Sequence, residues 1–391
     1  MSPRTRLVVA FASTALTAYI ALGILLGRVL GDSTYSQLSV FNEVVRLVLE
    51  AYVEPVNLDK AMAGANLGLT EALDGDSAYL SPEDFEAYQR GLDPGAADVG
   101  LVLTRRFGFL MVVATRPGSP AEKAGIETGD ILKTIDGRHS RTIPVPVGDR
   151  LLRGAPGSEV RLEVLRARHD PLELKLVRER LAAAEPERRQ LEDGTGYLHL
   201  REFSPGTAAA VRGELEVLRR AGVERLVLDL RGAAYGRPED AVGVAESFLK
   251  GGVVARTAGR RETEQTLTAR EDHNAWSLPV AILIDNGTAG PGEIVAAALL
   301  DAERGPLVGE PTFGRAPVQK TIPLPEGGLL ITVAKYMSPK GTPIHGEGVQ
   351  PGVLVRAPEG DTSEEPAAAK QDPVLDKALE LLRETAQKKA A

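Results

Sequence analysis

The sequence predicts a multidomain α+β protein in which a membrane helix and a helical cap precede a small β domain and a larger α/β core. The chain has 391 residues, 43% of them hydrophobic, so it can bury more than one core. After a long uncharged N-terminal run, the pattern passes from helical periodicity to short strands and then to strand–helix alternation. The predicted boundaries of the membrane helix, cap segment, β domain, core and C-terminal linker with helix are 1–31, 34–95, 96–170, 171–356 and 357–391.

Charge and composition exclude several classes of function. The net charge is −8 and no Lys/Arg-rich block is interleaved with aromatic residues, so we expect no nucleic-acid partner. The absence of cysteine excludes disulfides, thiolate metal sites and a lipid anchor on cysteine. The histidines lack the spacing of metal ligands, so we expect neither a metal nor another cofactor. They are His139, His169, His199, His273 and His345.

The N-terminal segment predicts where the protein is located. Arg4 and Arg6 precede an uncharged run, 7–27, that is long enough to cross a bilayer as a helix. Basic residues before the run favour an N-terminus inside the cell and export of the rest of the chain. We therefore expect a membrane-anchored, exported protein, held by the inner membrane and periplasmic if the source is a Gram-negative bacterium. A cleaved signal peptide is the alternative, because it shares this charge pattern.

The segment after the membrane helix is predicted to be helical up to about Gln89. Ser81 is expected to cap a helix whose first residue is Pro82, with Asp84 as the acid of a capping box. We assign this segment a structural role and no chemistry. The apolar residues that recur near a period of 3.6 are Leu38, Phe41, Val44, Val45, Leu47, Val48 and Leu49.

Short β-like runs separated by turn residues follow between Val99 and Arg166. In their middle, Ser119 is expected to cap a short helix that begins at Pro120. The stretch SPAEKAGIETGDILKTIDG resembles a PDZ domain. The resemblance implies that a peptide C-terminus binds by strand addition, with its carboxylate held by backbone N–H groups. The residues expected to form that binding loop are Val99, Gly100, Leu101 and Val102.

Two features depart from the PDZ pattern. Asp98 stands where related domains usually have glycine, and it places a negative charge beside the expected carboxylate site. The helix that should border the groove falls near Pro146–Arg153, where Pro144, Pro146 and Gly148 predict a poor helix. The resemblance therefore supports the fold more strongly than it supports the binding of peptide carboxylates.

Strands and helices alternate from about Leu172 to Arg356, which predicts an α/β layer. The runs RLVLDLR (Arg225–Arg231) and VAILID (Val280–Asp285) are expected to be buried strands. Helices are expected over Thr207–Gly222, over PEDAVGVAESFLKGG and over GEIVAAALLDAE. After a polar linker, PVLDKALELLRETAQKK is expected to form an amphipathic helix that packs on the core.

The segment VAILIDNGTAGPGEIVAAALL, with TFGRAPVQ downstream, resembles the catalytic core of the carboxyl-terminal processing peptidases of family S41. The resemblance implies a Ser–Lys dyad, in which a serine at the start of a helix attacks and a neutral lysine accepts its proton. The family's serine lies in a turn of the form SASASEI, and its lysine lies in TFGKG. This chain has Gly290 and Arg315 at these positions, and Gln319 matches the glutamine that assists the dyad. Glycine has no nucleophile, and arginine keeps its proton at physiological pH.

The turn expected to bind the oxyanion also departs from the family pattern. The family's LDLRNNPGG is LDLRGAAYGR here. Tyr235, just before Gly236, therefore stands where a glycine would let substrate approach. Thr288 is the fallback nucleophile, but its family counterpart is not the nucleophile and Arg315 cannot act as its base. Lys320 is expected to point away from the site along its strand, so it does not replace the lysine.

The favoured hypothesis is a membrane-anchored, exported pseudoprotease that binds unfolded or C-terminal peptide segments as an adaptor or regulator of proteolysis. Its expected partners are such segments and an active protease relative, in homo- or hetero-oligomers. The first alternative is an active serine-type endopeptidase with a non-standard nucleophile or base. The second is a structural envelope protein that binds no peptide.

Overall fold

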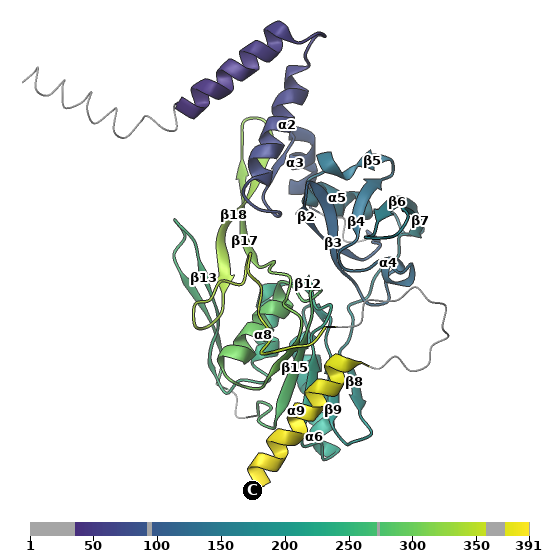
Figure 1. The fold of residues 1–391 in the computed structure, drawn as a ribbon, viewed down its shortest axis with the longest axis vertical. Coiled ribbons are helices and arrows are strands. Elements are labelled where there is room, and N and C mark those ends of the chain that lie inside the picture. The colour runs from purple at the N-terminus through teal and green to yellow at the C-terminus, as the bar shows by residue number, and fades with distance from the viewer. Residues whose placement is uncertain (1–35, 92–95, 272–273, 357–371, 391) are drawn as a thin grey trace, which may run out of the picture. The chain divides into compact units, whose positions relative to one another are not determined.

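The computed structural model describes residues 36–91, 96–271, 274–356 and 372–390 (Figure 1). The chain divides into two units, residues 1–63 and 64–391. A helix covers residues 36–51 of the first unit, and α2 (Leu58–Glu71) begins there and ends in the second unit. The predicted membrane helix, 1–31, lies outside the described residues. Within the described ranges, no helix combines the length and the apolar character that crossing a bilayer requires.

The segment predicted as helical up to Gln89 contains both helix and strand. α3 (Pro82–Gln89) begins as predicted, because the Ser81 hydroxyl accepts the Asp84 N–H at 3.2 Å. β1 (Ala78–Leu80) departs from the helical prediction, since it pairs antiparallel with β18 (Gly328–Met337) of the core. Three residues are too few to specify a strand locally, so this pairing is decided by tertiary structure.

A small β domain follows α3. Its elements are β2 (Leu101–Arg106), β3 (Phe109–Thr115), α4 (Pro120–Lys123), β4 (Ile131–Ile135), β5 (Arg138–His139), α5 (Val145–Leu152), β6 (Glu159–Leu165) and β7 (Leu172–Val177). The strand order is β2-β3-β4-β6-β7, with β5 beside β4, so β2 is an edge strand. Ser119 caps α4 as predicted, accepting the Glu122 N–H at 3.2 Å. β7 pairs with β6, and the domain therefore continues past the predicted boundary at residue 170.

The helix that borders the groove does form, and the prediction of a poor helix was wrong. Pro144 is the N-cap of α5 and Pro146 lies in its first turn. A proline there removes only an N–H that has no partner within the helix, so both prolines start the helix without breaking it. A Cβ at Gly148 would lie 2.6 Å from Leu110 Cδ1, so this glycine lets α5 approach the sheet.

The core is built around a six-stranded sheet of the order β19-β16-β15-β11-β9-β8. These strands are β8 (Glu187–Gln190), β9 (Gly196–His199), β11 (Leu226–Asp229), β15 (Val280–Ile284), β16 (Leu307–Gly309) and β19 (Val353–Leu354). β8 pairs antiparallel with β9, and the other neighbours pair in parallel. The helices are α6 (Thr207–Arg220), α7 (Pro238–Ala245), α8 (Pro291–Asp301) and α9 (Pro373–Ala390).

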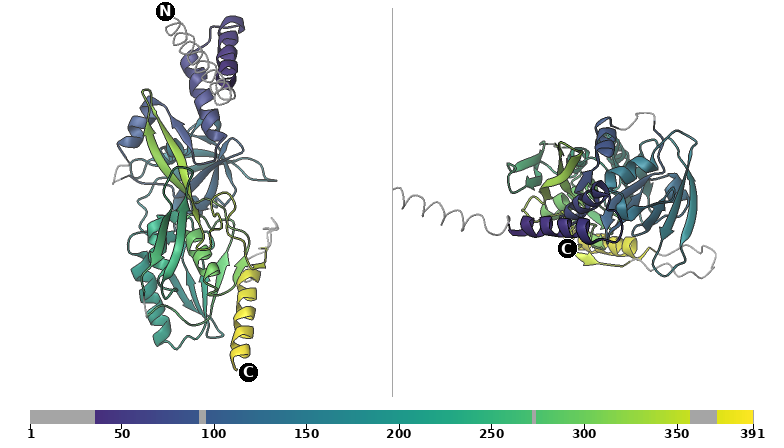
Figure 2. Two further views of the ribbon diagram at one scale, coloured as in Figure 1. Left: turned by 90° about the vertical axis from the view of Figure 1, so that its left-hand side faces the viewer. Right: turned by 90° about the horizontal axis from the view of Figure 1, so that it is seen from above.

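Residues of the parallel strands alternate between two apolar layers, as the period of a strand requires. Ile282 and Ile284 of β15 pack with α6, α7 and α8, whereas Ala281 and Leu283 pack with α9. Figure 2 shows α9, in yellow, alongside this sheet. The C-terminal helix therefore packs on the core as predicted. Among the side chains of α9 that the structure describes, the buried ones are Val374, Ala378 and Leu382.

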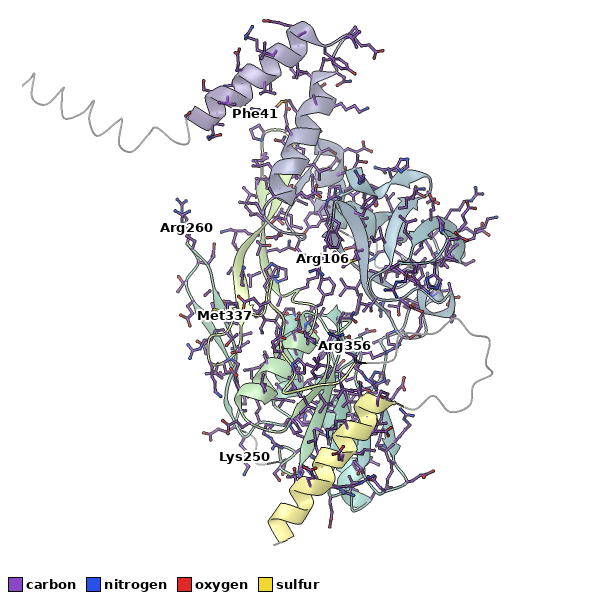
Figure 3. The ribbon with its side chains drawn as sticks, in the orientation of Figure 1. Phe41, Arg106, Lys250, Arg260, Met337 and Arg356 are labelled. Carbon is purple, nitrogen blue, oxygen red and sulfur yellow. The ribbon has the colours of Figure 1, made fainter. Side chains whose placement is uncertain are left out.

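A second sheet and a short strand pair complete the core. The second sheet contains β1, β18, β13 (Gly252–Ala258) and β14 (Gln265–Ala269), with β17 (Pro317–Pro323) beside β18. Arg260, exposed between β13 and β14, lies at the outer end of that hairpin (Figure 3). β10 (Glu202–Phe203) pairs in parallel with β12 (Tyr235–Gly236), next to the turn that was predicted to bind the oxyanion.

Candidate active site and peptide groove

The turn between β15 and α8 places Gly290 at the start of a helix. Gly290 is the N-cap of α8 and has φ 51° and ψ −112°, a conformation that L-residues rarely adopt. A sharp strand–turn–helix connection of this kind presents the nucleophile in hydrolases with a nucleophile elbow. A Cβ added at Gly290 would meet only the Arg315 carbonyl oxygen, at 3.4 Å. The turn thus has room for a serine side chain and carries none.

Glu293, in the first turn of α8, joins this turn to the loop that carries Arg315. Its buried carboxylate accepts the N–H groups of Gly290 at 2.9 Å, Gly314 at 2.6 Å and Arg315 at 2.9 Å. The Thr312 hydroxyl donates to it as well. Burial raises the pKa of Glu293 to about 7, although these hydrogen bonds act in the opposite direction. One side chain therefore sets the distance between the two positions of the predicted dyad.

Arg315 is held in an ion pair with Asp76. Its Nε lies 2.7 Å from Asp76 Oδ1, and the Asp76 side chain is only 4% exposed. Gln319 Nε2 donates to the Asp76 carbonyl oxygen at 2.7 Å. Burial alone would lower the pKa of Arg315, but Asp76, Asp149 and Glu293 raise it above its ordinary value. The guanidinium stays protonated and cannot serve as a general base.

The predicted oxyanion turn places a hydrogen-bond acceptor, the Ala233 carbonyl oxygen, next to the start of α8. The Ala289 N–H donates to the Ala233 carbonyl at 3.1 Å, and a Cβ at Gly292 would lie 2.2 Å from the same oxygen. In a nucleophile elbow, the N–H of the residue after the nucleophile helps to bind the oxyanion. That residue is Pro291, which has no N–H. The arrangement therefore lacks this donor and has a carbonyl oxygen close by.

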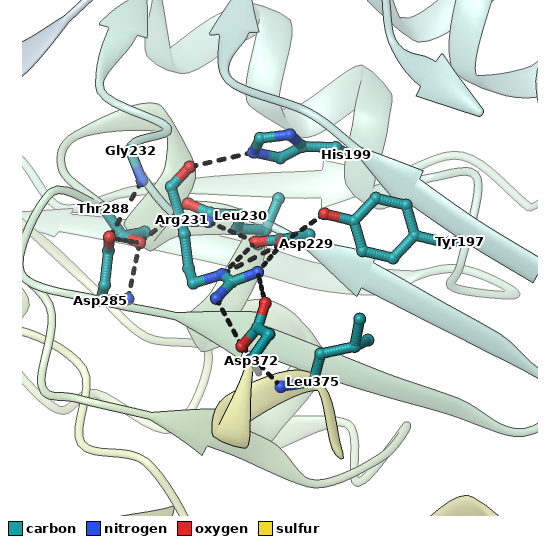
Figure 4. A network of polar contacts seen from close by, with 10 residues as sticks. All are labelled: Tyr197, His199, Asp229, Leu230, Arg231, Gly232, Asp285, Thr288, Asp372 and Leu375. Carbon is teal, nitrogen blue, oxygen red and sulfur yellow. Dashed lines mark hydrogen bonds and ion pairs between the residues drawn. The ribbon is translucent and has the colours of Figure 1, made fainter. Parts of the chain in front are cut away.

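Thr288, the fallback nucleophile, is fully buried, and its hydroxyl forms hydrogen bonds with the backbone. Its hydroxyl donates to the Leu230 carbonyl at 2.8 Å and accepts the Asp285 N–H at 3.1 Å (Figure 4). Asp285 Oδ1 in turn accepts the Gly232 N–H at 3.0 Å. This hydroxyl joins the two turns to each other.

Beneath the predicted oxyanion turn, Arg231 connects β11 to the C-terminal helix (Figure 4). Its Nη2 lies 2.5 Å from Asp229 Oδ2 and 2.8 Å from Asp372 Oδ2. Asp372 also accepts the Leu375 N–H at 3.0 Å in the first turn of α9, and the Tyr197 hydroxyl donates to Asp229 at 2.6 Å. Burial alone would lower the pKa of Arg231, but these two carboxylates raise it. The start of α9 is thereby tied to the residue that precedes the turn.

Tyr235 is clamped by a buried ion pair. The Arg116 guanidinium lies 3.9 Å from the centre of the Tyr235 ring, and its Nη2 lies 3.0 Å from Glu202. Such contacts with an aromatic face are favourable, most of all when the cation is desolvated. At Gly236, φ is 125° and a Cβ would lie 1.8 Å from the Phe203 oxygen, so the pairing of β12 with β10 requires glycine there.

The β domain covers the two turns with an apolar cluster. Val102, Val113 and Ala114 from β2 and β3 pack against Ala234 and Ala289. Arg106 is at the end of β2 (Figure 3), and its guanidinium lies over the Phe313 ring, 5.6 Å from its centre. Ala289 is 1% exposed beneath this cluster, whereas Gly290 beside it is partly exposed.

Two cavities border the remaining predicted residues. The larger, of about 630 Å³, is lined among others by Leu101, Val102, Tyr235, Gly236 and Arg315. The smaller, of about 420 Å³, is lined by Asp76, Gln319 and α5. Asp149, Arg153 and Arg315 line both cavities, and burial raises the pKa of Asp149 to about 6. Val99 and Gly100, just before β2, are buried and do not line the larger cavity.

The structure brings Gly290, Arg315 and Gln319 together around Asp76 and Glu293, two residues that sequence reasoning did not select. The signal for Glu293 was a lone acid in the first turn of an otherwise apolar helix. Asp76 had no local signal, because its partners lie far along the chain. Pro291 was visible in the sequence, but its effect on a backbone donor follows only once the turn is placed.

Comparisons with known proteins identify the family of the core and of the β domain. Residues 194–355 match the model of peptidase family S41, and residues 111–166 match a PDZ domain model. The carboxy-terminal processing protease CtpA of Bacillus subtilis is 28% identical over 90% of this chain and 76% of its own length. The carboxy-terminal-processing protease of Bartonella bacilliformis is 30% identical over 84% of this chain and 77% of its own length. The solved photosystem II D1 C-terminal processing protease is 28% identical, with a TM-score of 0.68 over 80% of this chain and 86% of its own.

Proposed function

The chain belongs to peptidase family S41, with a PDZ domain and carboxyl-terminal processing proteases as its homologues, and from this premise we propose that it binds unfolded or C-terminal peptide segments without cleaving them. The observation that carries the proposal is the pair of positions 290 and 315. The first has the backbone of a nucleophile elbow and no hydroxyl, and the second holds a protonated guanidinium paired with Asp76.

Hydrolysis needs three groups that this site does not supply together. An acyl transfer requires a nucleophile, a base that is neutral before it accepts the proton, and donors aimed at the developing oxyanion. Gly290 and Arg315 remove the first two. Pro291 removes one donor, and the Ala233 carbonyl lies against the same turn. Restoring serine and lysine alone therefore leaves oxyanion stabilisation incomplete.

Binding does not need these groups. β2 pairs with a strand on one side only. On the other side the Gly75 carbonyl accepts the Arg105 N–H at 3.2 Å, while Leu101, Val102 and Leu103 border the larger cavity together with Tyr235 and Gly236. An extended segment can add to that part of β2 through main-chain hydrogen bonds, with its side chains in the two cavities. The contact of the Arg116 guanidinium with the Tyr235 ring holds one wall of the groove rigid, which lowers the entropic cost of binding.

The run 7–27 and the basic residues before it support a protein anchored in a membrane with its bulk exported. In that setting the chain acts as an adaptor or regulator of proteolysis. It either presents peptide segments to an active protease relative or withholds them from it, in a homo- or hetero-oligomer.

The proposal is tested with the full chain in detergent micelles and casein as an unfolded substrate. We expect casein to bind, measured by fluorescence anisotropy, and no fragments to form, measured by mass spectrometry, while an active carboxyl-terminal processing protease cuts it. Cleavage that is abolished by Thr288→Ala but retained by Thr288→Ser would overturn the proposal in favour of an enzyme with an unusual nucleophile. Absence of casein binding would favour a structural envelope protein.

The double variant Gly290→Ser, Arg315→Lys sharpens the test. We expect it to cleave casein at least about a hundredfold more slowly than the triple variant that also carries Pro291→Ala, because removal of one oxyanion donor costs about a hundredfold or more in rate. Rapid cleavage by the double variant with Pro291 in place would contradict the role given to that missing N–H.

A further inference from the structure

The loop before β2 holds a carboxylate of its own. Asp98 Oδ1 accepts the N–H of Val99 at 2.7 Å and the N–H of Gly100 at 3.1 Å. These are two of the backbone donors in the loop that a PDZ domain uses to hold the carboxylate of a peptide. Both donors are already paired within the chain.

The other oxygen of the same carboxylate is paired with a cation from the groove helix. Arg153, which follows α5 directly, places its Nε 3.2 Å from Asp98 Oδ2, and the two side chains are 24% and 13% exposed. A bound peptide carboxylate would be expected to have the same kind of neighbours, two backbone N–H groups and a nearby guanidinium. Asp98 thus takes the position that such a ligand would take.

The backbone around Asp98 keeps the carboxylate in place. The Asp98 N–H donates to the Glu179 oxygen at 2.9 Å, and the Glu179 N–H donates back to Asp98 at 3.0 Å. Gly100 has φ 82°, and a Cβ there would lie 2.2 Å from Ser119 Cβ, so the loop holds a shape open to glycine alone. The filled loop is therefore a fixed part of the fold.

We propose that Asp98 fills the carboxylate-binding loop of this PDZ domain from within, so that the domain binds internal segments of unfolded chains and does not select free C-termini. The inference rests on the proposed function and narrows its ligand class. A second carboxylate in the loop would meet the charge of Asp98 and find two donors occupied. An internal segment meets neither obstacle, because it carries no terminal charge and binds along the part of β2, Leu101 to Leu103, that borders the larger cavity. The cavities on the two sides of Asp149, Arg153 and Arg315 leave room for it to continue.

The test compares short apolar peptides made in pairs, as the free acid and as the C-terminal amide, against the full chain by fluorescence anisotropy. We expect the natural protein to bind both forms with equal affinity. We expect Asp98→Gly, which empties the loop and frees Arg153, to prefer the free acid by about tenfold, the effect of one charge-assisted hydrogen bond. The added change Arg153→Ala should reduce that preference.

Asp98→Asn is the matched control, because its amide oxygen still accepts the two N–H groups although the charge is lost. It should bind both forms equally, as the natural protein does. A preference of the natural protein for the free acid would overturn the inference while leaving peptide binding intact. A preference in Asp98→Asn as large as in Asp98→Gly would also overturn it, since charge alone would then exclude the acid. Failure of the natural protein to bind either form or casein would overturn the proposed function itself.

Discussion

The turn at Gly290 and the loop at Asp98 both have the backbone of a working site, but their side chains depart from the family pattern in opposite directions. At Gly290 the elbow is present and the reactive group is absent. At Asp98 an added carboxylate occupies donors that a ligand would use. In both places the backbone is held by neighbours, Glu293 in one and Glu179 in the other. The comparison teaches that a backbone held by buried contacts does not by itself fix which side chain it presents.

Removal of Glu293 tests the first half of this comparison and has the largest expected effect on the free energy of unfolding. Glu293→Ala leaves three backbone N–H groups and the Thr312 hydroxyl without their acceptor. We expect the free energy of unfolding to fall by about 4 kcal/mol, measured by urea denaturation. Glu86→Ala, at an exposed position of α3, is the control and should change it by less than about 0.5 kcal/mol. A loss as small as that of the control would show that Glu293 does not hold the elbow.

Removal of Arg315 tests whether this position now serves structure. Arg315→Ala leaves the buried Asp76 carboxylate unpaired, so we expect a loss of about 3 kcal/mol. The exposed pair of Arg237 with Asp240 provides the control, since Arg237→Ala should cost about 0.5 kcal/mol or less. In a double-mutant cycle with Asp76→Ala, independent effects of the two changes would contradict the ion pair.

The pH dependence of stability probes the wall between the two cavities. The pKa of Asp149 is about 6 in the folded chain against 3.8 for the ordinary group, so the folded state binds this proton more tightly. The free energy of unfolding should therefore fall as the pH rises from about 4 to about 6, by about 2 kcal/mol from this residue. Asp149→Asn should remove that part of the decrease, which thermal melts across this pH range would detect. An unchanged pH profile would contradict the raised pKa.

Adding a side chain at Gly290 tests whether the turn before α8 imposes backbone strain. Gly290→Ser has space but needs φ near 51°, so we expect a cost of about 1.5 kcal/mol and no protease activity. Gly213→Ala, in α6 with open space around it, should instead stabilise by about 0.5 kcal/mol. Equal effects of the two changes on urea denaturation would mean that the elbow imposes no strain.

Removing the Asp98 side chain tests the other half of the comparison, the loop before β2. Asp98→Gly loses two hydrogen bonds and the pair with Arg153, so we expect a loss of about 1 kcal/mol in urea denaturation. Asp98→Asn should retain most of that stability. Greater stability of Asp98→Gly than of the natural protein would show that the carboxylate strains the loop.

Local patterns predicted much of the fold. The strands at Val280 and Leu226, the cap at Ser81 and the cap at Ser119 are present because each depends on residues adjacent in sequence. Predictions failed for two elements, for different reasons. β1 exists because of its pairing with β18, far along the chain. α5 forms because Pro144 is its N-cap, Pro146 lies in its first turn and Gly148 meets Leu110.

The sequence by itself determined the alternation of strands and helices, the family resemblance and the identities at positions 98, 290 and 315, since these follow from residue type and spacing. Only the tertiary structure decided what those residues do. It paired Arg315 with Asp76, placed Glu293 among three backbone donors and set Arg153 against Asp98. The physical reason is that hydrogen bonds and ion pairs depend on distances of a few ångströms between groups far apart along the chain, which no local pattern encodes.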